Sequence, residues 1–240
     1  MDLILVDNTS EYQHSNFFSD KPLKNFLHTY PLQIVSKLLK EDRYQNVIDI
    51  GCADGILLPT LSKNYKKVYA IDIQTDFFPY ILKYKLKNLI LKKMDVQKMN
   101  FKDGFFDLSL CLETLEHVKN PEKAIQEIKR VLKKDGIGII SVPIEIGGSL
   151  LLKQSGRLLL GYGLDYEGGY TLRELFNASI LKKPNKVWHQ EHLGHRGFDY
   201  RDIMGYLQDH GLKILRIQYL PLNIFGDSLA YRVIIKFKKV

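Results

Sequence analysis

The feature that most constrains the fold of this chain is a regular alternation of short β-branched runs with longer amphipathic segments. Apolar runs of this length, bounded by turn residues, are typical of strands that are buried on both faces. Seven strands are expected, at 46–50, 68–73, 89–94, 106–112, 136–142, 213–219 and 231–237.

Most of the segments between these strands have helical periodicity. The clearest helix begins at Asn120, which can cap it, and continues with Pro121 at the first helical position. Gly136 is expected to close this helix. Other helices are expected at 23–39, 55–64, 76–86 and 200–210.

Strand–helix alternation predicts an α/β fold: a Rossmann-like, seven-stranded, mostly parallel sheet with helices on both faces. The last two strands have no long helical crossover between them, so we expect the final strand to run antiparallel. Residues 144–198 break the alternation. We expect them to form a helical insertion after strand five that covers the carboxyl edge of the sheet, where ligands bind in such folds.

The most informative segment is residues 47–55, which read VIDIGCADG. A buried strand here ends in a tight turn with small residues at positions 51, 53 and 55. Small residues let backbone amides approach a ligand closely, and the following helix directs the positive end of its dipole to the same place. This pattern predicts a site for a nucleotide-like cofactor.

Two features of this turn favour S-adenosylmethionine over a dinucleotide. The dinucleotide fingerprint has a third small residue where this chain has Ile56. Asp49 lies two residues before Gly51, and a carboxylate there would repel a diphosphate but attract an ammonium group. S-adenosylmethionine carries an ammonium and a sulfonium and has no phosphate.

Acidic residues at the ends of the next two strands fit the same cofactor. Asp72 lies 21 residues after Gly51 and can accept hydrogen bonds from both ribose hydroxyls, although it would serve NAD equally well. Asp95 follows the third strand, where it can accept a hydrogen bond from the adenine amino group while Val96 packs on the ring.

With these motifs the chain resembles the class I S-adenosylmethionine-dependent methyltransferases of the type 11 group. The resemblance covers about residues 46–143 and is loose beyond them, and Ala53 stands where the family more often has glycine. The matching segments are DIGCADG at 49–55, AID at 70–72, MDV at 94–96, FDL at 106–108, ETLEHV at 113–118 and VLKKDG at 131–136.

The resemblance implies an S-adenosylmethionine site and a division of the chain. We expect one methyltransferase domain over 1–240, with an N-terminal arm (1–22), a cofactor-binding core (23–143), an insertion or lid (144–198) and a C-terminal part of the core (199–240). The residues expected to line the cofactor are Asp49, Gly51, Cys52, Ala53, Gly55, Asp72, Ile73, Asp95, Val96 and Leu112.

Glu113, Glu116 and His117 are the candidate catalytic residues, because they follow the fourth strand at the edge where the methyl group should lie. Their spacing predicts that all three share one face of a short helix. Three roles stay open: a structural element, a general base centred on His117, or a metal site. The last is similar to that of metal-dependent O-methyltransferases of small-RNA ends and ubiquinone precursors, and His195 or His192 could complete it.

The insertion contains an amphipathic segment at 149–161, with leucine triplets at 150–152 and 158–160. It can be a lid that packs on the domain, a dimer contact, or a lip that touches an apolar acceptor at a membrane surface. The partner expected is therefore a small-molecule acceptor, with glycan and lipid-linked intermediates included.

Composition excludes several classes of protein. Apolar residues make up 45% and charged residues 26%, which rules out a disordered chain, a collagen and a disulfide scaffold. The net charge of +8 permits an anionic partner, but the lysines are scattered and nucleic acid is not favoured. Two isolated cysteines, and no apolar run of 18 residues, predict a cytoplasmic protein without a transmembrane segment.

The expected function is methyl transfer from S-adenosylmethionine to a small molecule or a glycan or lipid intermediate. The alternatives are a non-catalytic member of the same fold, a nicotinamide-dependent oxidoreductase, and a metal-assisted O-methyltransferase of RNA or quinone type. A chain that had lost the cofactor would have no physical reason to keep Asp49, Gly51, Asp72 and Asp95 together, so the non-catalytic alternative is weakened.

Overall fold

The computed structural model describes residues 2–5, 17, 18, 20–39, 45–159, 170–185 and 195–240. For 156–159 only the backbone is described. The predicted candidate His192 lies outside these ranges.

The strands form one seven-stranded sheet in the order β3-β2-β1-β4-β5-β7-β6. Strands β1 to β5 pair in parallel, and β7 runs antiparallel to both of its neighbours, which confirms the predicted sheet. The strands are β1 (Asn46–Ile50), β2 (Lys67–Asp72), β3 (Leu89–Lys93), β4 (Phe106–Leu112), β5 (Leu132–Pro143), β6 (Leu212–Leu220) and β7 (Arg232–Lys239).

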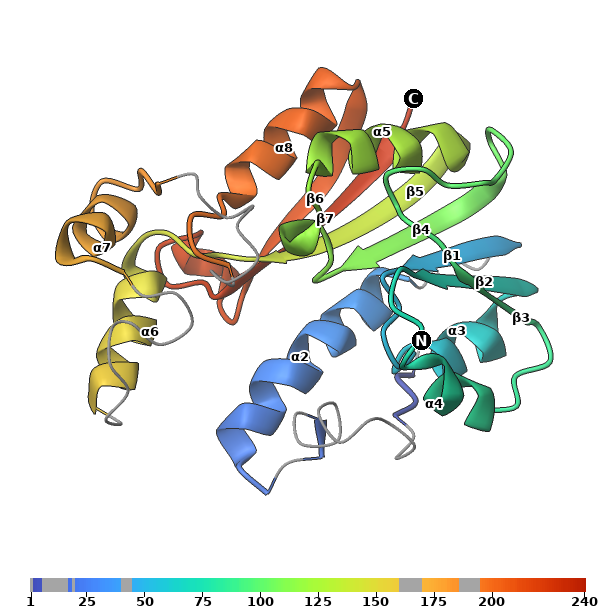
Figure 1. Ribbon diagram of the computed structural model, residues 1–240, viewed down its shortest axis with the longest axis horizontal. Coiled ribbons are helices and arrows are strands. Elements are labelled where there is room, and N and C mark those ends of the chain that lie inside the picture. Colours follow the sequence, from blue (N-terminus) through green and yellow to red (C-terminus); the bar gives the residue numbers. More distant parts are fainter. Residues whose placement is uncertain (1, 6–16, 19, 40–44, 160–169, 186–194) are drawn as a thin grey trace.

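Helices cover both faces of this sheet, and α6 and α7 extend beyond the end of β5 (Figure 1). In Figure 1, α5 and α8 lie on one face, while α2, α3 and α4 lie on the other. The α-helices are α2 (Pro22–Leu38), α3 (Leu58–Asn64), α4 (Phe78–Lys83), α5 (Pro121–Val131), α6 (Gly148–Leu159), α7 (Leu172–Ser179) and α8 (Tyr200–Asp209), and the 3-10 helices are η1 (Leu115–His117) and η2 (Asn223–Phe225).

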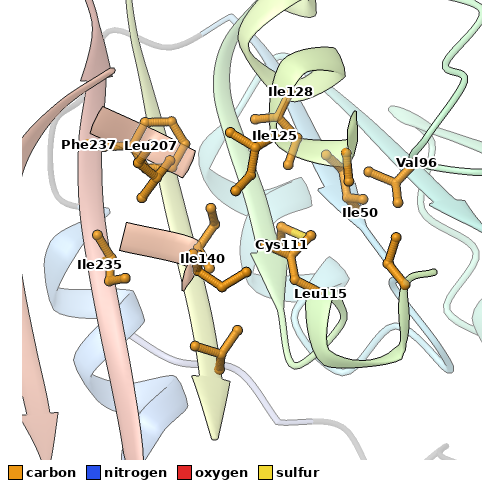
Figure 2. Packing of buried hydrophobic residues seen from close by; sticks show 14 of the residues in the cluster. Ile50, Val96, Cys111, Leu115, Ile125, Ile128, Ile140, Leu207, Ile235 and Phe237 are labelled. Atoms are coloured by element: carbon orange, nitrogen blue, oxygen red, sulfur yellow. The ribbon is translucent and has the colours of Figure 1, made fainter. Parts of the chain in front are cut away.

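Two hydrophobic cores form because successive strand residues point to opposite faces of the sheet. Val47 belongs to the core beneath α2 and α3, whereas Ile48 belongs to the core beneath α5 and α8. Figure 2 shows α5 and α8 placing apolar side chains over the strands. The residues labelled there on this face include Cys111, Ile125, Ile128, Ile140, Leu207 and Ile235.

The start of α5 was predicted correctly and its end was not. The Asn120 Oδ1 atom accepts a hydrogen bond from the Lys123 amide at 2.9 Å, as expected of a cap. The helix, however, ends at Val131, and β5 begins directly at Leu132. Leu132 pairs with Phe106 of β4, so sheet pairing draws the chain out of the helix before Gly136 is reached.

The helices expected at 55–64 and 76–86 are shorter than predicted, because α3 and α4 each begin one residue before a proline. Proline is well suited to the first turn of a helix, where the amide hydrogen that it lacks would have no partner within the helix. Pro59 and Pro79 therefore fix where these helices begin.

The order of the strands determines where a ligand can bind. Connections leave β1 and β4 in opposite directions, so the carboxyl ends of these neighbouring strands form the switch point at which ligands bind in open α/β sheets. The helices α6 and α7 follow β5 at the same edge, and the Gly147 amide donates to the Ala178 carbonyl at 3.0 Å. Among the described residues, no helix combines the length and apolar character needed to cross a bilayer.

Candidate active site

The turn after β1 has a backbone that favours small residues. Gly51, Ala53 and Gly55 all have positive φ, at 70°, 45° and 78°. The Gly51 amide donates to the Ile71 carbonyl at 2.8 Å, which ties the turn to β2. A Cβ atom added at Gly51 would overlap the side chain of Thr114, so both conformation and space require glycine there.

Asp49 is a buried carboxylate at the base of this turn, with 5% of its surface exposed. Burial, together with the nearby charge of Asp72, raises its pKa to about 7. Within the described part of the chain its carboxylate has no hydrogen-bond partner. A ligand ammonium would supply the counter-charge that Asp49 lacks.

Asp72 lies at the end of β2 and helps to shape the turn. Its two carboxylate oxygens accept hydrogen bonds from the amides of Ala53 and Gln74, both at 2.9 Å. A carboxylate has further lone pairs, so these contacts leave room for ribose hydroxyls. The neighbouring Ile73 is 59% exposed.

The remaining predicted cofactor residues lie along the same edge of the sheet. Asp95 follows β3 and accepts a hydrogen bond from the Gln97 amide at 2.8 Å. Val96 and Cys52 are buried, and Leu112 at the end of β4 is half-buried. Burial raises the pKa of the Cys52 thiol, so the thiol stays protonated. This agrees with the expectation that Cys52 contacts the cofactor and takes no part in the chemistry.

Glu113, Glu116 and His117 do not share one helix face, so that prediction was wrong. Glu113 precedes η1 with a φ of 50°, and this left-handed residue turns its side chain away from the helix. Its carboxylate forms an ion pair with Arg232 at 2.8 Å and accepts a hydrogen bond from the Ser141 hydroxyl at 2.7 Å.

Glu116 and His117 instead meet His195, which lies near the end of the insertion. One ligand-capable atom from each residue lies within 4.8 Å of the others. The two imidazole Nε2 atoms are 3.3 Å apart. Partial burial, and then the neighbouring His195, lower the pKa of His117, so His117 is neutral near pH 7.

Glu116 is the unusual member of this group. It is 2% exposed, and neither carboxylate oxygen has a hydrogen-bond partner among the residues that the structure describes. Burial, and then the charge of Glu113, raise its pKa well above the ordinary value. A buried carboxylate without a donor is costly unless a cation balances it, and one carboxylate with two imidazoles is a donor set that divalent transition metals accept. The residues present therefore fit a divalent cation.

Two polar residues of this region were missed from the sequence. Arg232 at the start of β7 is the partner of Glu113. Glu145, two residues beyond β5, is 4% exposed and lies 2.6 Å from Lys153 and 3.7 Å from His195. Burial alone would raise the pKa of Glu145, but His195 and Lys153 hold it below its ordinary value. An acidic residue inside the apolar run 142–146 was the signal that could have revealed it.

Comparison with known proteins supports the same family. A family model described as a methyltransferase domain matches residues 48–140. A ubiquinone biosynthesis O-methyltransferase of Glaesserella parasuis is 32% identical over 174 residues, which is 68% of each chain. An uncharacterised protein of Methanocaldococcus jannaschii is 35% identical over 127 residues, and the match spans 51% of this chain and about half (52%) of that protein.

A solved structure extends the likeness in fold to nearly the whole chain. The N-methyltransferase NodS of Bradyrhizobium japonicum, in complex with S-adenosyl-L-homocysteine, superposes with a TM-score of 0.59 at 14% identity, over 97% of this chain and 99% of that one. At this identity the likeness concerns the fold alone. The relative from Glaesserella parasuis and the methyltransferase-domain model, with which the fold agrees, assign the chain to the class I S-adenosylmethionine-dependent methyltransferases.

Proposed function

We propose that this chain transfers the methyl group of S-adenosylmethionine to an oxygen atom of a small acceptor, and that Glu116, His117 and His195 hold a divalent cation beside it. The observation that carries the proposal is the buried Glu116 carboxylate, which has no donor in the described chain and lies next to two imidazoles. Glycan and lipid-linked compounds fall within the acceptors considered, and the cytoplasmic location expected from the sequence stays a prediction.

The cofactor would lie over the turn after β1. In this arrangement Asp49 balances the ammonium, Asp72 accepts the ribose hydroxyls, and Asp95 accepts the adenine amino group while Val96 contacts the ring. The positive φ values at Gly51, Ala53 and Gly55 support this placement, because a tight turn of small residues lets a ligand approach the backbone closely. Cys52, Ile73 and Leu112 would supply the remaining contacts.

The cofactor supplies an activated methyl group, so the protein has mainly to align the two reactants. Alignment of this kind can lower a barrier by about 7–11 kcal/mol. A bound divalent cation supplies a positive charge that lowers the pKa of an acceptor hydroxyl. Neutral His117 lies at the end of η1, where it can either bind that cation or accept the acceptor's proton itself.

Similarity to O-methyltransferases of ubiquinone biosynthesis supports an oxygen acceptor on an aromatic ring. One such relative is 32% identical over two thirds of this chain. Catechols present a phenolic hydroxyl with a second oxygen beside it, so they are suitable first probes.

The test is methyl transfer from labelled S-adenosylmethionine to 3,4-dihydroxybenzoate, with Mg²⁺ or with EDTA. We expect turnover that EDTA abolishes and that Glu116→Gln lowers at least tenfold. Glu122→Gln is the matched control, because that carboxylate lies on the surface beside His210 and outside the cluster. Turnover that survives both EDTA and Glu116→Gln would contradict the cation. Cofactor binding without turnover on any of a panel of catechols and phenols would favour the non-catalytic alternative.

A further inference from the structure

The carboxylate of Glu145 lies behind the histidine that the insertion brings to the site. Its Oε1 atom is 3.7 Å from Nδ1 of His195, whereas the other ring nitrogen, Nε2, lies 3.3 Å from Nε2 of His117. The two nitrogens of His195 therefore have different neighbours: a carboxylate on one side and the candidate cation site on the other.

This arrangement favours one tautomer of neutral His195. A neutral imidazole carries its proton on one nitrogen only, and a neighbouring carboxylate favours the proton on the nitrogen that faces it. A proton on Nδ1 leaves the lone pair of Nε2 directed toward Glu116 and His117. Histidines that bind metals are commonly oriented in this way by a carboxylate behind the ring.

A purely structural ion pair with Lys153 does not account for the burial of Glu145. The Lys153 side chain is 48% exposed, whereas the Glu145 side chain is 5% exposed. An exposed lysine contributes little to stability through such a pair, and burying the carboxylate costs free energy. The burial is explained if the carboxylate must lie against His195.

We propose that Glu145 is a positioning residue that holds His195 in the Nδ1-protonated form for cation binding, and that Lys153 holds Glu145 in turn. The inference rests on the cation site proposed above. Lys153 belongs to α6, so the first helix of the insertion helps to hold the proposed cation site through Glu145.

The test is the affinity for Mn²⁺ alone, followed by electron paramagnetic resonance, in the wild type and in single variants. We expect Glu145→Ala and His195→Ala each to weaken Mn²⁺ binding about 10–100-fold, and Lys153→Met to weaken it by less than tenfold. Asp227→Asn is the matched control, since it removes a carboxylate that pairs with Lys182 at 2.7 Å at the same end of the molecule without contacting His195. Circular dichroism verifies that each variant is folded.

A second readout reports the tautomer directly. Nitrogen-15 NMR of the histidine rings without metal should show the proton of His195 on Nδ1 in the wild type and a shift toward Nε2 in Glu145→Ala. If the wild type binds no Mn²⁺, the cation site and this inference fail together. If the wild type binds Mn²⁺, His195→Ala does not, and Glu145→Ala binds as the wild type does, this inference alone is overturned.

Discussion

The Nε2 atoms of His117 and His195 lie 3.3 Å apart, although 78 positions separate the two residues in the sequence. His117 ends η1 after β4, in the core of the fold, whereas His195 lies near the end of the insertion. Like charges disfavour each other, so the neighbouring His195 adds to the burial that lowers the pKa of His117. The insertion thus contributes a side chain to the candidate active site, in addition to any role as a cover.

Gly51 should tolerate no side chain. Gly51→Ala forces a Cβ atom into a left-handed position and onto Thr114, so we expect it to lower the free energy of unfolding by at least about 1–2 kcal/mol. Gly205→Ala is the control: it lies in α8 with open space around it, and it should stabilise the chain by about 0.5–1 kcal/mol. Urea denaturation measures the free energy of unfolding of both variants. Equal changes in the two variants would show that the backbone at Gly51 is not constrained.

Asp49 should make stability depend on pH. Its pKa is about 7 in the folded chain and 3.8 ordinarily, so the folded state binds this proton more tightly than the unfolded state. The stability that this proton contributes is fully present below pH 3.8, and it is lost as the pH rises through about 7. Asp49→Asn removes that loss and should raise the thermal midpoint of the cofactor-free chain at pH 8 by a few degrees more than at pH 4.

The same variant should bind S-adenosylhomocysteine at least tenfold more weakly at pH 8, because the charge facing the ammonium is gone. A gain in stability that does not vary with pH would contradict the assignment of the titrating proton to Asp49.

Glu113 and Glu116 should respond in opposite ways to the same substitution. Glu116→Gln removes a buried charge without a donor in the described chain, so we expect lost Mn²⁺ affinity and unchanged or higher stability without metal. Glu113→Gln weakens the pairing with Arg232 and should cost about 1–3 kcal/mol of stability while changing Mn²⁺ affinity by less than threefold. Thermal melts measure the stability of both variants, and Mn²⁺ titrations measure their affinity for the metal. The same change in stability and in affinity for both variants would contradict the separate placement of the two carboxylates.

Asp72→Ala should weaken cofactor binding at least tenfold, through loss of charge-assisted hydrogen bonds to the ribose. The substitution also removes the acceptor for the Ala53 amide, so the turn itself loses a support. Equilibrium dialysis with labelled S-adenosylmethionine measures the change, and an unchanged affinity would remove Asp72 from the site.

The strands and the glycine turn could be predicted because they are local patterns. The short β-branched run of β1, which is buried on both faces, and the small residues at 51, 53 and 55 are visible in the sequence without knowledge of distant contacts. The end of α5 was missed because pairing of Leu132 with Phe106 is a tertiary contact that overrides the signal at Gly136.

The candidate site was only partly predictable, for a related reason. Spacing suggested that Glu113 belongs with Glu116, but a left-handed backbone at Glu113 separates them, and non-glycine residues with positive φ have no clear sequence signal. His195 was one of two candidates for completing the group. The role inferred for Glu145 depends on where the insertion folds, which no local pattern reveals.

The most direct test of the account is a calorimetric titration of S-adenosylhomocysteine into the wild-type chain, with NAD⁺ as the competing ligand. We expect saturable binding of one S-adenosylhomocysteine per chain and no binding of NAD⁺, because Asp49 attracts an ammonium and repels a diphosphate. Binding of NAD⁺ in preference to S-adenosylhomocysteine, or no binding of S-adenosylhomocysteine, would contradict it.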